Sequence, residues 1–217
     1  MNEIVKNSVN SKKKLMMIII VGLISALAVC GFCAVVLSDG LGDFLSREEK
    51  IEFPPLDPDS FAETKGENFD IMEYDEYLSL DRTVTLENKD NGSTLTLEDS
   101  TYKNYGKGVA LVYEMLDALI AGDVVAYNSM VSEEAGHYEW FSQQQIYKVS
   151  IWEKSKTEIE TKNGNYTEYV IVLKYMIHEN NGSYRNNIAS DSARPQYIVI
   201  NDSTGKLMVM DIIDTLG

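Results

Sequence analysis

The sequence predicts an α+β domain carried behind one N-terminal transmembrane helix. Three observations support this prediction. Residues 15–37 contain no charged side chain, residues 105–121 place apolar side chains at helical spacing, and the chain after Tyr147 alternates between apolar and polar residues. Helices that precede a run of strands indicate an α+β arrangement, in which the two kinds of element are segregated.

Residues 15–38 are predicted to cross the membrane. As a helix they would span about 35 Å at ~1.5 Å per residue, against a hydrocarbon core of about 30 Å. Three consecutive lysines at 12–14 precede the segment and Asp39 follows it. This asymmetry places the tail 1–14 in the cytoplasm and the rest of the chain outside. We therefore expect a single-pass, signal-anchored protein of the cell membrane, with the lipid bilayer as a partner.

Two alternatives for this segment are a cleaved signal peptide and a lipoprotein signal. Ala26 and Ala28 have the small-x-small spacing of a cleavage site, and Cys30 follows Val29 at the place of a lipidated cysteine. The apolar run continues to Leu37, which is longer than the apolar region of a signal peptide. The length therefore favours a retained anchor.

Small side chains recur every fourth residue within this segment, at Gly22, Ala26, Cys30 and Ala34. Such a stripe lets two membrane helices approach closely, so it is a candidate surface for self-association; the alternative is the ordinary composition of a membrane helix.

Cys30 and Cys33 are the only cysteines. Their apolar setting argues against a redox pair, and no second pair exists to complete a zinc site.

The formal net charge of −15 excludes one class of partner and favours another. The short tail is net positive, so the outer region is more acidic than the chain as a whole. We expect no nucleic-acid binding, because no basic track exists outside the membrane. The unknown partner is expected to be a basic protein of the cell envelope.

Residues 39–81 are predicted to form an extended, acidic linker without stable structure. They contain three of the four prolines and many carboxylates, which oppose regular structure. Tyr77 and its apolar neighbours provide enough apolar surface for the last part to dock on the domain. Residues 82–100 then form a β-hairpin, because alternating runs flank the turn sequence 88–92.

Residues 101–217 make up the main α+β domain. A helix over 105–121 ends at Gly122, Asp123 caps a second helix over 124–130, and a third helix is predicted over 141–147. Turn sequences of the Asn-Gly type separate the strands that follow and predict an antiparallel meander. Its strands are expected at 149–159, 166–178, 184–188, 196–200 and 206–213.

This order of elements resembles the NTF2-like superfamily. The resemblance covers about residues 105–213 and depends on the Gly122-Asp123 break and on the Phe-Ser-Gln-Gln-Gln-Ile-Tyr segment at 141–147. It implies a cone in which a curved antiparallel sheet wraps around the long helix and leaves a pocket at its wide end. A short tail, one membrane helix and an outer NTF2-like domain also resemble the VirB8-like assembly proteins of conjugation machines.

Candidate catalytic residues are few. His137 and His178 are far apart in sequence and belong to no recognised metal or acid–base motif. Asp211 interrupts an apolar row on the last predicted strand, where it would be either a buried acid or the point at which that face reaches solvent. We predict no catalytic residue, no cofactor and no metal.

Aromatic residues provide the remaining signal, and they gather between the helices and the first long strand: Tyr138, Trp140, Phe141, Tyr147 and Trp152. Together with Asp211 they are the candidate pocket or partner surface; the alternative is core packing. The predicted function is a membrane-anchored, extracytoplasmic binding or assembly module without catalytic activity, as part of a cell-envelope or conjugation-type complex. The alternative is an enzyme or small-ligand binder that uses the NTF2-like pocket.

Overall fold

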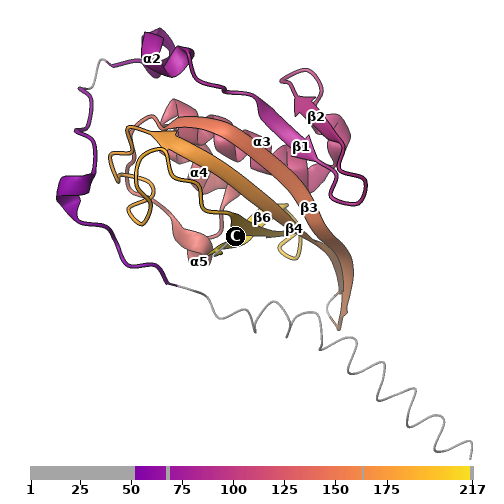
Figure 1. The fold of residues 1–217 in the computed structure, drawn as a ribbon. Coiled ribbons are helices and arrows are strands. Elements are labelled where there is room, and N and C mark those ends of the chain that lie inside the picture. The colour runs from indigo at the N-terminus through magenta and orange to yellow at the C-terminus, as the bar shows by residue number, and fades with distance from the viewer. Residues whose placement is uncertain (1–51, 67–68, 163, 216–217) are drawn as a thin grey trace, which may run out of the picture. The chain divides into compact units, whose positions relative to one another are not determined.

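The α+β class is confirmed by the computed structural model, which describes residues 52–66, 69–162 and 164–215 (Figure 1). Within these ranges no helix combines the length and the apolar character needed to cross a membrane. The predicted tail, the transmembrane segment and its stripe Gly22, Ala26, Cys30 and Ala34 lie outside the described residues. The short 3-10 helices are η1 (Pro58–Ser60), η2 (Ile71–Glu73) and η3 (Tyr102–Tyr105).

One mixed sheet holds the strands β1 (Val84–Glu87), β2 (Thr94–Leu97), β3 (Gln145–Thr161), β4 (Gly164–His178), β5 (Gln196–Asn201) and β6 (Met208–Asp214). Their spatial order is β2-β1-β3-β4-β5-β6. The predicted hairpin is confirmed as the antiparallel pair β1–β2, and β3 to β6 form an antiparallel meander.

The sequence analysis did not predict the ladder that joins the hairpin to the meander, and this ladder is parallel. Strand β1 runs parallel to β3, with Val84 opposite Val149 and Leu86 opposite Ile151. The helices lie between these two strands in the sequence, and a crossover of that length allows parallel pairing. The parallel ladder packs the thin apolar face of the hairpin against the main core. An isolated pair of strands would be only marginally stable without such packing.

Helix α3 (Lys107–Ala121) packs against one face of the sheet and supplies the centre of the core (Figure 1). Gly122 ends it with φ 69° in the left-handed region, and the amide of Asp123 donates to the carbonyl of Ala118 at 2.8 Å. Asp123 then accepts a hydrogen bond from the amide of Ala126 and caps α4 (Val124–Met130). The predicted helix–Gly-Asp–helix junction is therefore confirmed.

The predicted third helix over 141–147 is wrong. A short helix, α5 (Glu133–Gly136), lies earlier, and β3 already begins at Gln145. The backbone of this stretch finds its partners elsewhere: the amide of Gln144 donates to the carbonyl of Leu119, and Tyr147 pairs with Met176. Tertiary hydrogen bonding thus overrides the local helical pattern.

The predicted strand over 184–188 is also wrong, because residues 179–195 form a loop. The buried side-chain amide of Asn180 donates through Nδ2 to the backbone carbonyls of Arg185 and Ile188, both at 2.8 Å. One side chain thereby satisfies two backbone acceptors that a strand would offer to a neighbour. The loop that results places Arg185 against the sheet.

The described part of the predicted linker packs on the domain. Ile71 in η2 and Tyr77 in α2 (Asp75–Leu78) are each 1% exposed. The hydroxyl of Tyr77 donates to the carbonyl of Ile146 at 2.8 Å. Further up the chain, the amides of Leu56 and Ala62 donate to carbonyls of the 179–195 loop. The predicted docking of the last part of the linker through Tyr77 is therefore confirmed, whereas the expectation of a linker without stable structure is wrong for 52–66 and for the 3-10 helix at Ile71.

Candidate functional site

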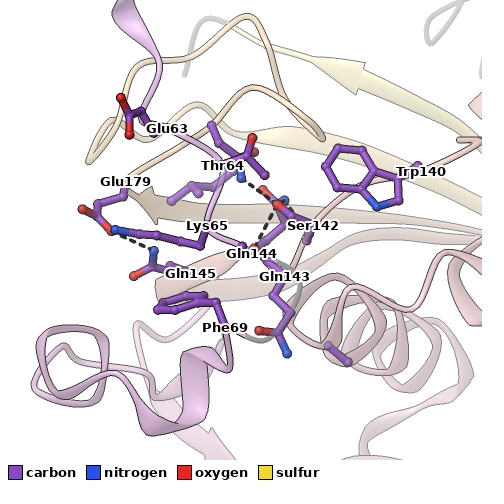
Figure 2. Close-up of a pocket in the computed structure, with 14 residues that line it drawn as sticks. Glu63, Thr64, Lys65, Phe69, Trp140, Ser142, Gln143, Gln144, Gln145 and Glu179 are labelled. Carbon is purple, nitrogen blue, oxygen red and sulfur yellow. Dashed lines mark hydrogen bonds and ion pairs between the residues drawn. The ribbon is translucent and has the colours of Figure 1, made fainter.

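A cavity of about 530 Å³ opens where residues 63–66 and Phe69 cross the start of β3 (Figure 2). We call it the amide pocket, because four residues with side-chain amides line it: Gln143, Gln144, Gln145 and Asn181. Its position follows from the fold: the end of α3 and the linker hold the extended segment before β3 between them.

A charged pair forms one wall of the amide pocket. Lys65 Nζ lies 3.0 Å from Glu179 Oε2, and Gln145 Nε2 donates to the same oxygen at 3.2 Å (Figure 2). Burial acts to raise the pKa of the Glu179 carboxyl, but the hydrogen bonds from Lys65 and Gln145 outweigh burial and hold the pKa below its ordinary value. Glu179 is therefore ionised at neutral pH and fixes Gln145 in place.

A hydrogen-bond network fixes the neighbouring amides. Gln144 is 1% exposed, and its Nε2 donates to the carbonyl of Ser142 at 2.7 Å and to Ser183 Oγ at 3.1 Å. Asn181 Nδ2 donates to Ser142 Oγ at 2.6 Å. Gln143 Oε1 accepts from the amide of Ile71, which ties the linker to the pocket. The amide pocket is therefore largely preformed.

One buried polar atom in the amide pocket lacks a partner. Gln145 is 5% exposed, and its Oε1 accepts no hydrogen bond from the described residues. A buried acceptor left unpaired costs about 1–3 kcal/mol. Trp140, 59% exposed, lies at the side of the pocket opposite Glu179 (Figure 2). The arrangement suits a ligand that donates a hydrogen bond to Gln145 and places apolar surface on Trp140.

The predicted aromatic surface is divided among separate places. Trp140 alone lines the amide pocket. Phe141 and Tyr138 pack with Tyr127 and Tyr184, with ring centroids 5.3–5.8 Å apart, in the interior between α4 and the 179–195 loop. Core packing therefore accounts for Phe141, which is 1% exposed.

The other predicted residues lie apart from this cluster. The hydroxyl of Tyr147 donates to Asp191 at 2.9 Å. Trp152 lies under Lys89, whose Nζ is 4.1 Å from the ring centroid. Asp211 is half-buried on β6, where its carboxylate accepts from the amide of Ile212. These residues do not converge on one site.

The two histidines also lie in separate places. His137 Nε2 is 2.8 Å from the carbonyl of Val131, and His178 Nδ1 is 3.1 Å from Asp191 Oδ1. In the part of the chain that the structure describes, no three His, Cys, Asp or Glu side chains are grouped to hold a metal. The contacts of His137 and His178 fasten loops to the domain.

The sequence prediction missed Lys65, Glu179 and the glutamines 143–145. Three consecutive glutamines, with Phe141 and Tyr147 each two positions away, are an unusual polar run for a buried segment. The helical prediction for 141–147 concealed this signal, since a helix would direct the three amides to different sides. Lys65 gave no signal because it lies in the predicted linker.

Comparisons with protein-family models, with curated proteins and with solved structures find no match for the chain. The geometry of the site and the sequence pattern therefore carry the functional argument.

Proposed function

We propose that the chain is a single-pass membrane protein whose C-terminal domain, of the NTF2-like type, binds a partner outside the membrane without catalysing a reaction. The uncharged segment 15–38 and the lysines before it support the anchor and its orientation. The long helix α3 against a sheet with a four-stranded antiparallel meander supports the NTF2-like assignment. The resemblance of the predicted topology to that of VirB8-like assembly proteins supports a role in assembling an envelope complex.

The amide pocket carries the proposal of binding. It contains a buried acceptor, Gln145 Oε1, in a lining fixed by hydrogen bonds, with the exposed ring of Trp140 on the opposite side (Figure 2). Its lining includes no histidine, cysteine or tyrosine, and the hydroxyl of Ser142 is engaged by Ser183 and Asn181. The Ser142 hydroxyl is therefore not paired with a general base among the described lining residues.

The proposed ligand is a segment of a basic envelope protein. A peptide N–H matches the vacant acceptor of Gln145, and an apolar side chain of the partner would cover Trp140. The acidic surface of the chain, with a net charge of −15, favours a basic partner and speeds the encounter. The pocket would orient the bound segment of the partner, and the negative charge of the chain would attract the partner over a longer range.

A photoreactive amino acid at position 140 tests this proposal in native membranes. Val125 is the matched control position, because it is 76% exposed on α4 and does not line the amide pocket. We expect a discrete crosslinked partner from position 140 and none from position 125. We also expect Gln145→Leu to reduce the yield at 140, with a loss of about 1 kcal/mol in unfolding free energy from the hydrogen bond to Glu179. Equal capture from both positions would contradict binding at the amide pocket.

A further inference from the structure

The two edges of the sheet differ in what covers them. At the β6 edge, Val131 pairs with Val209 in a parallel bridge, and the amide of Ser132 donates to the carbonyl of Val209 at 2.7 Å. Helix α5 follows directly after this contact. Strand β2 forms the opposite edge and pairs with β1 on one side (Figure 1). No described segment pairs with its other side, so the β2 edge is open.

The register of the hairpin determines which backbone groups of β2 point outward. At the turn, the amide of Asn88 donates to the carbonyl of Ser93 at 2.8 Å, so the backbone of Ser93 faces β1. Backbone groups alternate in direction along an antiparallel strand, so Leu95 also faces β1, whereas Thr94 and Thr96 face away from it. The N–H and C=O groups of both threonines are therefore available to a further strand.

The composition of β2 does not block such pairing. Natural edges are often protected by prolines, charged side chains or bulges, and Thr94–Leu97 contains none of these. Leu95 is 41% exposed, although it lies on the same side of the strand as Leu97, which is buried in the core. An apolar side chain on an added strand would cover the exposed part of Leu95.

Carboxylates flank the open edge at both ends. Asp90 lies in the turn before β2, and Glu98 follows the strand directly. Both are exposed, and neither forms an ion pair within the described part of the chain; the nearby lysines, Lys89 and Lys103, pair with other carboxylates. A second copy of this chain would bring like charges together here, whereas a segment with basic ends would be attracted.

We propose that the β2 edge binds an extended segment of a basic partner protein as an additional strand of the sheet. The backbone of the segment pairs with Thr94 and Thr96, an apolar side chain lies beside Leu95, and a Lys or Arg at each end faces Asp90 or Glu98. Backbone pairing supplies affinity, while the side chains of the segment supply selectivity. The β2 edge is separate from the amide pocket, whose lining includes no residue of the hairpin.

The probe that tests this surface is the peptide Lys-Thr-Val-Thr-Val-Lys, acetylated at its N-terminus and amidated at its C-terminus. The full-length, ¹⁵N-labelled chain in mild detergent is titrated with it, and hydrogen exchange of single backbone amides is followed by NMR. At saturation we expect exchange at Thr94 and Thr96 to slow about tenfold, the effect of one hydrogen bond, and exchange at Leu95 to change less.

Two control peptides separate strand pairing from charge. Lys-Thr-Pro-Thr-Pro-Lys keeps both lysines but cannot pair as a strand, so it should leave the exchange of Thr94 and Thr96 unchanged. Glu-Thr-Val-Thr-Val-Glu can pair but carries the wrong charge, and should bind about tenfold more weakly than the lysine peptide. Equal binding of the proline peptide would show charge attraction alone and overturn the proposal.

Variants of the chain make the test specific. Thr96→Pro removes an N–H that makes no bond to β1 and should abolish the slower exchange at Thr94, whereas Thr96→Ala keeps this N–H and should bind like the unmodified chain. Asp90→Lys combined with Glu98→Lys leaves the backbone intact and should weaken the lysine peptide about tenfold.

Three results would overturn the proposal. The first is unchanged exchange at Thr94 and Thr96 with the lysine peptide. The second is equal binding of that peptide to Thr96→Pro, to Thr96→Ala and to the double lysine variant. The third is slow exchange at Thr94 and Thr96 without any peptide that becomes slower with protein concentration, since this would place a second copy of the chain on the β2 edge.

Discussion

Arg185 Nη2 lies 2.6 Å from Asp214 Oδ1, and only 4% and 15% of the two side chains are exposed. This pair joins the 179–195 loop to the last strand. Asp214→Ala would leave a buried guanidinium without its counter-charge, so we expect a loss of about 3–5 kcal/mol in the free energy of unfolding. Urea denaturation followed by tryptophan fluorescence measures it. Lys103→Ala breaks the exposed pair with Glu114 and should cost about 1 kcal/mol at most.

Tyr77 tests the docking of the linker. Tyr77→Phe removes the buried hydrogen bond to the carbonyl of Ile146 and keeps the ring, so we expect a loss of about 1 kcal/mol in unfolding free energy. Residues 69–81 should also become more sensitive to limited proteolysis. Tyr74→Phe, whose exposed hydroxyl donates to Glu76, is the control and should change neither quantity. Identical digestion of both variants would argue against a docked linker.

Gly122 is required both by its backbone angle and by its surroundings. It has φ 69°, and a Cβ would meet the backbone nitrogen of Gln143 at 2.9 Å. Gly122→Ala should therefore cost about 2 kcal/mol or more and displace the wall of the amide pocket. Gly205→Ala is the matched control, because Gly205 has φ 82° but nothing lies near its would-be Cβ. Equal losses in chemical denaturation would show that the contact with Gln143 has no effect.

Asp117 makes stability depend on pH. Partial burial, with the carboxylates of Asp99 and Glu114, raises the pKa of this side chain from 3.8 to about 6. Because the pKa of Asp117 is higher in the folded than in the unfolded state, the neutral acid contributes to the free energy of unfolding. This contribution is complete below about pH 4 and is lost as the pH rises through 6. Asp117→Asn should therefore stabilise the fold at pH 8, by about 1 kcal/mol or less given the surface exposure of Asp117, and not at pH 3.5. Asp90→Asn in the hairpin turn serves as the control.

Features set by neighbouring residues were predictable from the sequence. The Gly122-Asp123 junction uses a left-handed glycine and an aspartate cap, both of which act within one turn of helix. The turn at 88–92 likewise defines the β1–β2 hairpin, and its Gly92 has φ 69°. Such signals need no knowledge of the rest of the chain.

Features set by distant contacts were not predictable. Gln144 and Gln145 are extended because α3 and β4 supply their backbone partners, and these partners lie far away in the sequence. The amide pocket also depends on Lys65, which meets Glu179 only after the linker has folded onto the domain. The apolar residues around Tyr77 predicted that the end of the linker docks, but the sequence did not reveal that Ile71 is buried as well or that 52–66 also pack on the domain.

The proposed function depends most directly on which side of the membrane the domain occupies. Single cysteines at Asn165 and at Glu3, in a chain that lacks Cys30 and Cys33, can be labelled in intact cells with a membrane-impermeant maleimide. We predict that Asn165→Cys reacts in intact cells, whereas Glu3→Cys reacts only after permeabilisation. Labelling of Asn165→Cys only after permeabilisation would place the domain inside the cell and contradict an extracytoplasmic binding module.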